Sequence, residues 1–227
     1  MQRFFDVVLS GCALLLLSPL ILPIALILRF TGEREVLYIQ KRMGIGGKEF
    51  GIYKFATMLK NSPTMGAGTV TVRDDPRILP IGAFLRTTKI NELPQLINIF
   101  VGDMSIVGPR PLVRKGFDAY DKKTQVLISA QRPGLSGMGS LVFRNEERLL
   151  HQASDPLKFY YGTVAPFKGQ LEAWYAAHAS MALYVKVIAL TVLLIARPDS
   201  KRVYVWFPDL PKPPADLGAL LFKAEHE

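Results

Sequence analysis

The sequence predicts an α+β fold that is mostly helical and is attached to a membrane by one helix. Two observations carry this prediction: residues 4–28 form a long apolar run, and residues 35–58 contain two β-prone runs around a glycine cluster. Several later stretches have the apolar spacing of short helices. We therefore expect a re-entrant membrane helix, interfacial amphipathic helices and a small β-hairpin.

The apolar run is long enough to cross a bilayer core, which takes about 20 residues in a helix. Its middle carries Ser18-Pro19. Proline removes one helical hydrogen bond and clashes with the preceding turn, so it kinks or breaks the helix. A helix broken at this depth can turn back and leave through the face that it entered. A spanning helix is the default for such a run, whereas the proline favours a re-entrant helix over residues 1–30.

The charge distribution predicts a cytoplasmic body and an anionic partner. Cationic residues gather just after the apolar run and a single arginine precedes it, so the positive-inside rule places the body in the cytoplasm. The net charge of +9 suits nucleic acid, acidic lipid or a phosphorylated substrate. The basic residues are spread out and no nucleic-acid motif is present, so no nucleic-acid partner is expected. The single cysteine, Cys12, excludes a disulfide framework.

Residues 35–58 have the pattern of a β-hairpin. Two runs rich in β-branched and aromatic residues flank Gly44, Gly46 and Gly47, which are typical of a turn. The glycine cluster lacks the ending of a phosphate-binding loop and a following helix. Lys54 in the second run is a better candidate for contacting an anion, the alternative being an ordinary solvated lysine.

The stretch from Lys89 to Pro111 predicts a short helix, and we expect the reactive residues of the protein to lie in this stretch. Asn91 is a strong N-cap residue, and Gly102 is a plausible stop. Asn91 and Glu92 are therefore expected beside free N–H groups and the positive end of the helix dipole, a place suited to phosphate. The expected buried face has the i, i+3, i+4, i+7 spacing of Leu93, Leu96, Ile97 and Phe100.

Other residues that could bind phosphate or a metal ion lie in proline-containing turns. Arg110 lies between Pro109 and Pro111, and arginine binds phosphate through two parallel hydrogen bonds. The adjacent acids Asp74 and Asp75 suit either a divalent metal or, as we favour, a capped turn. Residues 132–137 are expected to form a tight polar turn, whose arginine either meets a diphosphate or is simply exposed.

The chain divides into an expected membrane helix at 1–30, a cytoplasmic or interfacial catalytic domain at 31–205 and a proline-rich tail at 206–227. A helical stretch is expected from Leu112 to Ala130, and one or two helices over 164–196. The apolar segment at its end is short for a membrane crossing, so it is expected to be interfacial or buried. The last dozen residues suit a short amphipathic helix.

Together these stretches resemble one family, the monotopic phosphoglycosyl transferases, also called bacterial sugar transferases. The resemblance covers residues 1 to about 195, with its motifs in the order of the family. It rests on Ser18-Pro19, a hairpin at Gln40–Met58, a DPR segment at Asp75–Arg77, the block Asn91–Pro111 and the RPGxxG turn at Arg132–Gly137.

The resemblance implies a function at the cytoplasmic face of the bacterial inner membrane. An Asp-Glu pair working with Mg²⁺ takes a phosphosugar from a UDP-sugar, UMP leaves, and polyprenol (undecaprenyl) phosphate accepts the phosphosugar from a covalent enzyme intermediate. Asn91 and Glu92 fall on the catalytic and metal-binding pair. The expected phosphate-binding residues are Lys54, Arg77, Arg110 and Arg132. Membrane lipids are further expected partners, and a homodimer is one option for assembly.

One departure from the family pattern concerns the nucleophile. Asn91 stands where the family has its attacking Asp, and an amide lacks the charge that attack and Mg²⁺ binding use. Three explanations are open: Glu92 has taken over the attack, the chain is an inactivated variant that still binds substrate, or it has kept only a binding role. In the third case it would be a membrane-anchored protein that binds nucleotide-sugar or lipid phosphate and recruits other enzymes.

Overall fold

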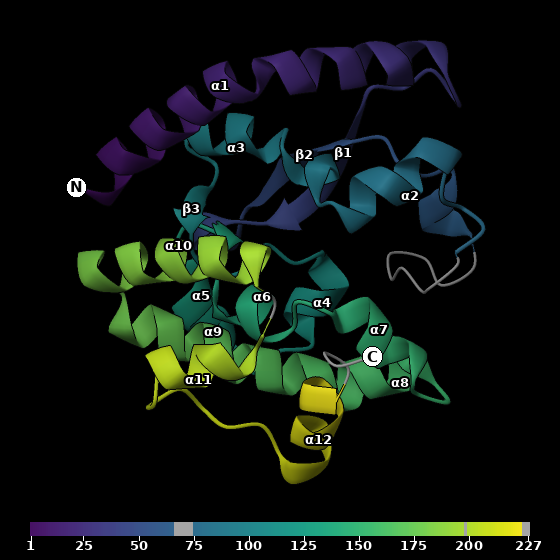
Figure 1. The fold of residues 1–227 in the computed structure, drawn as a ribbon. Helices are drawn as coiled ribbons and strands as arrows, with labels where there is room; N and C mark the ends of the chain where they lie inside the picture. The colour runs from purple at the N-terminus through teal and green to yellow at the C-terminus, as the bar shows by residue number, and fades with distance from the viewer. Residues whose placement is uncertain (66–74, 198, 224–227) are drawn as a thin grey trace.

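The computed structural model describes residues 1–65, 75–197 and 199–223, and it confirms the mostly helical α+β class. Figure 1 shows one long helix, α1 (Gln2–Phe30), lying along one side of the body, with the hairpin and α3 beneath it and α9 to α12 on the opposite side. The other elements are β1 (Leu37–Met43), η1 (Ile45–Gly47), β2 (Glu49–Phe55), η2 (Ser62–Thr64), α2 (Pro80–Thr87), η3 (Ile90–Glu92), α3 (Gln95–Val101), β3 (Ser105–Val107), α4 (Arg114–Asp118), α5 (Lys122–Ser129), β4 (Gly134–Ser136), α6 (Met138–Val142), α7 (Glu146–His151), α8 (Pro156–Phe159), the π-helical η4 (Tyr160–Val164), α9 (Ala165–His178), α10 (Met181–Ala196), α11 (Lys201–Trp206) and α12 (Ala215–Lys223).

Helix α1 is continuous through Pro19 and Pro23, and Figure 1 shows it bent along its length. The expected break at Ser18-Pro19 is therefore absent, because the helix runs on through both prolines. Within the described residues α1 alone is long and apolar enough to cross a membrane. Its outward side chains form an unpartnered apolar face, on which Leu15 and Leu16 are 77% and 79% exposed.

The first turns of α1 are bound to the body by buried hydrogen bonds. Oδ1 of Asp6 accepts hydrogen bonds from Ser105 Oγ at 2.9 Å, from the Ile106 N–H at 3.0 Å and from the Tyr184 hydroxyl at 2.9 Å. We call these four residues the Asp6 anchor. Arg3 also donates to backbone carbonyls at the end of α3. The anchor joins α1 to β3 and to α10.

The last turns of α1 pack on the same body through apolar contacts. Ile24 and Leu28 are buried in one cluster with Phe55 of β2 and Leu85 of α2. Both ends of the long apolar helix therefore contact the folded domain, and its bent middle lies over it.

The predicted hairpin is confirmed. Strands β1 and β2 pair antiparallel, with Leu37 opposite Phe55 and Met43 opposite Glu49. The turn between them uses Gly46 at φ 66° and Gly47 at φ 68°, a backbone conformation that favours glycine.

The polar turn expected at residues 132–137 is wrong in part, because Gly134–Ser136 is a strand. β4 pairs in parallel with β3, with Ser105 opposite Gly134 and Val107 opposite Ser136. The approach is very close, since a Cβ on Gly134 would lie 2.1 Å from the Gly108 nitrogen. The loop after β3, which carries Arg110, therefore packs directly against residues 132–137.

The helical expectations hold with changes of length. The stretch expected at 112–130 is two helices, α4 and α5, and Asp121 caps the second by accepting from the Thr124 N–H. Residues 164–196 form two helices, as expected, after a π-helical turn. The helix expected near the C-terminus is α12.

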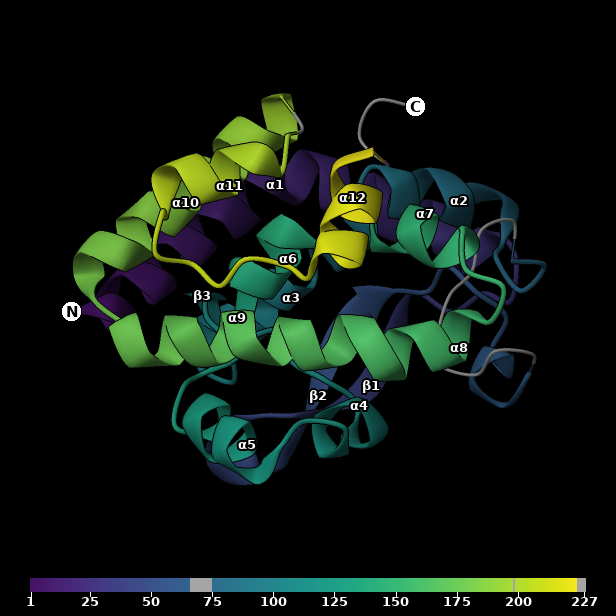
Figure 2. The same cartoon turned by 90° about the horizontal axis from the view of Figure 1, so that it is seen from below.

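The main core lies between α6, α7 and the helices α9 to α12. Figure 2 shows α9 running along this side with α10, α11 and α12 beside it. Leu210, Leu217 and Leu221, from the segment expected to be a separate tail, are buried in the same core. α10 packs one face into it and leaves Val192 and Ile195 exposed, which fits the expectation of an interfacial or buried helix.

Candidate active site

A cleft of about 1670 Å³ lies between the hairpin, α2 and η3 on one side and α6, α7 and α10 on the other. Four of the six predicted site residues line it together: Lys54, Asn91, Glu92 and Arg110. Further cationic side chains in its wall are Arg42, Lys60, Arg86, Lys89, Arg144, Arg148 and Lys168. The cleft therefore suits an anionic ligand.

The prediction that Asn91 is an N-cap residue is wrong. Asn91 lies inside the one-turn helix η3, and α3 begins only at Gln95 with Pro94 at its N-cap position. The asparagine side chain is buried, and its Oδ1 has no hydrogen-bond partner in the part of the chain that the structure describes. Asn91 therefore lines the cleft, but it does not mark the start of α3.

The later start of α3 also changes its buried face. Leu96 and Ile99 are buried, whereas Ile97 and Phe100 are 39% and 47% exposed. Asn98 is fully buried and joins α3 to β2, since its side-chain nitrogen donates to the Gly51 carbonyl at 2.8 Å. The stop at Gly102 is confirmed, with φ 108°.

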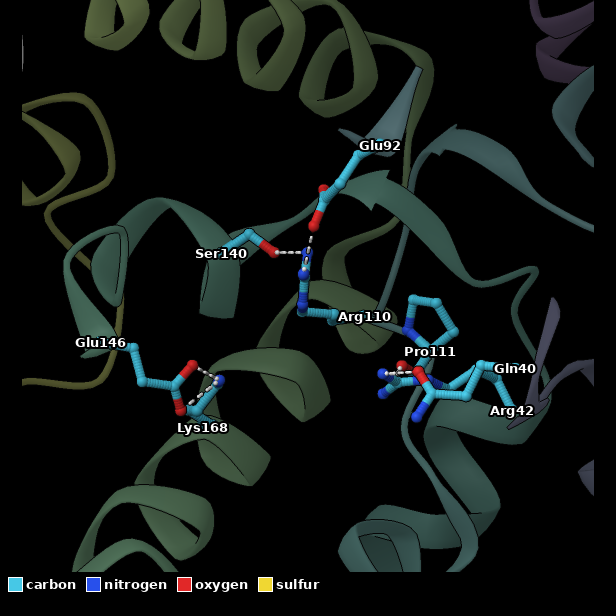
Figure 3. A network of polar contacts seen from close by, with 8 residues as sticks. All are labelled: Gln40, Arg42, Glu92, Arg110, Pro111, Ser140, Glu146 and Lys168. Carbon is cyan, nitrogen blue, oxygen red and sulfur yellow. Dashed lines mark hydrogen bonds and ion pairs between the residues drawn. The ribbon is translucent and has the colours of Figure 1, made fainter. Parts of the chain in front are cut away.

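Glu92 and Arg110 form an ion pair across the cleft. Arg110 Nη2 lies 3.1 Å from Glu92 Oε1, and Arg110 Nη1 donates to Ser140 Oγ at 3.4 Å. Figure 3 shows Glu92 and Ser140 both directed at the guanidinium, with the Gln40–Arg42 and Glu146–Lys168 pairs nearby. The side chains of Arg110 and Glu92 are 33% and 17% exposed, so the pair remains accessible.

Cations hold Glu92 in its ionised form. Burial would raise its pKa, but Arg110, Lys54 and Lys89 outweigh burial and lower the pKa to about 2. A carboxylate with so low a pKa is a weak base at neutral pH. Glu92 therefore suits the role of an anionic nucleophile or ligand better than that of a general base.

Lys54 is the titratable cation of the site. Burial lowers its pKa to about 7, and the positive charges of Arg42, Arg110 and Arg86 act in the same direction against the attraction of Glu92. An anion bound beside Lys54 would favour its charged form.

Sequence reasoning missed Arg42 as a site residue. Its Nη1 donates to the Pro111 carbonyl at 3.1 Å, and its Nη2 donates to Gln40 Oε1 at 2.6 Å. Burial and the nearby Arg110 lower its pKa to about 10. The signal was available, because alternate residues of a strand share one face, and Tyr38 in the same alternation pairs with Lys54.

Two buried titratable residues of α9 were also missed. Lys168 is 3% exposed and pairs with Glu146 Oε2 at 2.9 Å, and Glu172 is 2% exposed behind Arg110. Both residues lie more than 50 positions after Arg110 in the sequence, so no local sequence pattern indicated that they belong to the site.

Arg77 lies outside the cleft lining. It forms a two-bond pair with Asp75, in which Nε donates to Oδ1 at 2.8 Å, and its Nη1 donates to the Ser62 and Met65 carbonyls at 2.7 Å. This contact fits the favoured interpretation of Asp75 as part of a turn, while Asp74 lies outside the described residues.

Arg132 is likewise not brought to the cleft. It is exposed, and its Nε donates to the Gly102 carbonyl at the end of α3 at 3.1 Å. The residues that the structure brings together are thus a carboxylate, an amide and two of the four expected cations.

The predicted Mg²⁺ fits these residues only together with substrate oxygens. Among the described residues no group of three or more His, Cys, Asp or Glu side chains could hold a metal ion. Asn91, whose buried Oδ1 has no hydrogen-bond partner among the described residues, and Glu92 nevertheless both line the cleft, and their side chains carry the oxygen atoms that would hold the ion. Mg²⁺ commonly takes one or two protein carboxylates and completes its shell with substrate phosphates and water.

Comparison with known proteins gives one consistent answer. The model of a protein family described as "Bacterial sugar transferase" matches residues 1–198 of this chain. The chain is 36% identical over 159 residues to the exopolysaccharide production protein ExoY of Rhizobium meliloti (strain 1021), a match that covers 64% of this chain and 70% of that relative.

Two longer relatives match over about a third of their own length. The first is the UDP-glucose:undecaprenyl-phosphate glucose-1-phosphate transferase of Escherichia coli (strain K12), 34% identical over 70% of this chain and 35% of the relative. The second is the UDP-N-acetylgalactosamine-undecaprenyl-phosphate N-acetylgalactosaminephosphotransferase of Aeromonas hydrophila, 36% identical over 62% of this chain and 34% of the relative. Since the family match spans most of the sequence and confirms the resemblance in the motifs, this chain belongs to the bacterial sugar transferase family.

Proposed function

We propose that this protein transfers a phosphosugar from a UDP-sugar to polyprenol (undecaprenyl) phosphate, releasing UMP, as the first membrane step of glycan or exopolysaccharide assembly. The observation that carries the proposal is the accessible Glu92–Arg110 pair in a large cleft lined with cations. Two relatives are named for transferring a sugar phosphate to undecaprenyl phosphate, which supports the same substrate class here.

The donor diphosphate is proposed to bind against Arg110 and Lys54. The planar fork of arginine suits phosphate oxygens, and Lys54 gains its proton as the anion arrives, because the added negative charge raises its pKa from about 7. Mg²⁺, held by Glu92 and Asn91 together with the substrate, would neutralise part of the diphosphate charge.

The transfer is proposed to run in two displacements through Glu92. A carboxylate oxygen of Glu92 attacks the sugar-bearing phosphorus, and the bond from that phosphorus to the bridging oxygen breaks. UMP leaves with the bridging oxygen and its electron pair, and an acyl phosphate remains on Glu92. A phosphate oxygen of the polyprenol phosphate then attacks the same phosphorus and releases the carboxylate. The pKa of about 2 keeps Glu92 ionised for this role.

The test is UMP release with a panel of UDP-sugars and polyprenol phosphate. If Glu92 is the nucleophile, the chain turns over as it stands, Glu92→Gln is inactive, and mass spectrometry after UDP-sugar alone finds a phosphosugar adduct on Glu92. If the chain is an inactivated form, it binds UDP-sugar without releasing UMP, and Asn91→Asp raises turnover by several orders of magnitude.

The buried position of Asn91 changes the expected stability of that variant. A cap exchange would be almost neutral, but Asn91 is not a cap and is 6% exposed. Asn91→Asp places a further charge on an almost fully buried side chain, so we expect the free energy of unfolding to fall by roughly 1–3 kcal/mol in the absence of Mg²⁺ and substrate.

The second candidate function is a non-catalytic one. The amide at position 91, where the family resemblance expects the attacking carboxylate, favours a membrane-anchored protein that binds nucleotide-sugar or lipid phosphate and recruits other enzymes. If neither this chain nor Asn91→Asp releases UMP with any UDP-sugar, the catalytic proposal fails and the binding role replaces it.

We further propose that α1 enters one leaflet from the cytoplasmic side and returns to it, which places the site at the face of the bacterial inner membrane. The support is that the Asp6 anchor and the Ile24–Leu28 contacts hold both ends of α1 on one body. Cysteines introduced at Gln2 and Gly32 in a Cys12→Ser background should both react with an impermeant reagent from the cytoplasmic side alone. Reaction of position 2 from the periplasm would mean a spanning helix.

A further inference from the structure

Glu172 on α9 is a buried acid that the proposed chemistry does not use. Its side chain is 2% exposed, and its Oε1 accepts a hydrogen bond from the backbone N–H of Arg110 at 3.3 Å. Its Oε2 has no hydrogen-bond partner among the residues that the structure describes. A carboxyl group in such a place has a local reason to be there, because burial without full hydrogen bonding is costly.

Glycines allow the Glu172 carboxyl group to reach the backbone on both sides of the Arg110 loop. A Cβ on Gly139 would lie 2.5 Å from Glu172 Oε1, and a Cβ on Gly137 would lie 3.6 Å from Oε2 and 2.2 Å from the Gly108 carbonyl oxygen. The carboxyl group thus fits between the loop that carries Arg110 and the start of α6, which carries Ser140.

One face of α9 supports the site through three side chains at i, i+4 and i+7 spacing. Lys168 pairs with Glu146 of α7, Glu172 binds the Arg110 backbone, and the Tyr175 hydroxyl donates to the Val107 carbonyl at 3.2 Å. Of these three, Glu172 alone holds the residue whose guanidinium meets Glu92.

We propose that Glu172 is a positioning residue that fixes the backbone of Arg110, and that its carboxyl group is neutral when the site holds an anionic ligand most tightly. The neutral acid keeps the acceptor for the Arg110 N–H and adds no negative charge behind the guanidinium. The ionised form attracts Arg110 and competes with a bound diphosphate for its positive charge.

The electrostatics of Glu172 agree with this role. Burial raises its pKa to about 7, and the backbone N–H groups of Arg110 and Gly139, with the charge of Lys168, keep it from rising further. The other titratable groups that face it are Tyr120 and Tyr175, whose own pKa values are raised by burial and then by the charge of Glu172. Glu172 is therefore neutral below about pH 7 and anionic above it.

The first arm of the test needs no ligand. Hydrogen exchange is measured on the peptide spanning Gly108 to Leu112 in the full chain in lipid nanodiscs. Glu172→Ala should speed this exchange at least tenfold, whereas Glu172→Gln, which keeps an acceptor, should stay within about threefold of wild type. The matched control Tyr175→Phe removes a neighbouring hydrogen bond from the same helix face and should leave the Arg110 amide protected. Unchanged exchange in Glu172→Ala would overturn the positioning role.

The second arm measures the affinity for uridine diphosphate between pH 6 and pH 8.5, and it rests on the proposed function. Glu172→Gln should equal wild type at pH 6 and bind about three- to tenfold more tightly at pH 8.5, because it mimics the neutral acid. Lys54 also titrates near pH 7, but it is present in both proteins, so its effect cancels in the ratio of the two affinities. A ratio that stays constant with pH would overturn the neutral-acid role. If wild type binds no uridine diphosphate, the proposed function fails, and the exchange arm still decides the positioning role.

Discussion

Two arginines that each follow a proline, Arg77 and Arg110, have similar sequence contexts and very different surroundings. Arg77 is 3% exposed and pairs with Asp75, two residues before it on the same turn. Arg110 is 33% exposed and pairs with Glu92, which comes from η3 on the other wall of the cleft. The local pair also uses the Ser62 and Met65 carbonyls and is almost fully buried, so we call it the closed pair, whereas the remote pair is partly exposed in the cleft and is called the open pair.

The difference shows what separates a structural arginine from a candidate ligand-binding one. Neighbouring prolines stiffen both segments and do not distinguish them. The position of the acidic partner distinguishes them, because an arginine can pair with an acid on its own turn before any ligand binds. A partner from another element leaves a gap between two surfaces, and a phosphate can enter that gap.

The largest expected effect is on the closed pair. Arg77→Ala should lower the free energy of unfolding by about 3–5 kcal/mol, because it removes the guanidinium that binds the Asp75 carboxylate through two bonds, and the Asp75 side chain is only 2% exposed. Denaturant unfolding in detergent micelles measures the loss. The double variant Asp75→Asn, Arg77→Ala should lose less than the sum of the two single variants. A stable Arg77→Ala protein with weakened uridine diphosphate binding would instead move Arg77 into the site.

The open pair should have a pH signature. The pKa of Glu92 is about 2 when folded, below the ordinary value of 4.5, so its contribution to stability is complete above about pH 4.5 and is lost as the pH falls toward 2. The difference in unfolding free energy between wild type and Glu92→Gln should shrink by on the order of 3 kcal/mol over that window. A difference independent of pH would mean that Arg110 does not stabilise the ionised acid.

Arg110→Lys tests the ligand-binding side of the comparison. The substitution keeps the charge and loses the planar fork, so the affinity for uridine diphosphate should fall by roughly 1.5–3 kcal/mol, while stability changes little. Isothermal titration on the folded protein measures the affinity. If Arg110→Lys unfolds the protein and leaves the affinity of the folded fraction intact, the two arginines are alike after all.

The smallest expected effect is at Lys89, the third cation that lowers the pKa of Glu92. Lys89 has φ 59°, a left-handed conformation that costs side-chain-bearing residues free energy and suits glycine. Lys89→Gly should stabilise the fold by about 0.5–1 kcal/mol and raise the pKa of Glu92 slightly. Carbon-detected NMR titration of the carboxyl group measures the pKa. An unchanged pKa would limit the charges that act on Glu92 to Arg110 and Lys54.

Local patterns were sufficient to predict the elements built from neighbouring residues. The apolar run gave α1, and the glycines between two β-prone runs gave the hairpin. The stop at Gly102 followed from glycine alone. The motifs that carry the family resemblance predicted that Lys54, Glu92 and Arg110 lie in one site.

Elements that depend on distant partners were beyond local reasoning. β4 has only three residues and exists because it pairs with β3, about 30 positions earlier. Asn91 has the sequence pattern of an N-cap because short polar residues occur both at N-caps and in turns of 3₁₀ helix. The choice between the two depends on how the chain packs around the cleft. Glu172 has no local pattern at all, since its role depends on a loop some 60 residues before it.

The Asp6 anchor has a consequence for how the chain is made. Its hydrogen bond to Tyr184 joins residues 178 positions apart, and the bonds to Ser105 and Ile106 join residues about 100 apart. The apolar helix is therefore translated long before its acceptor carboxylate has any of these donors. The Asp6 carboxylate gains its last donor only after α10 has been made, so the docking of α1 on the body is completed late in the synthesis of the chain.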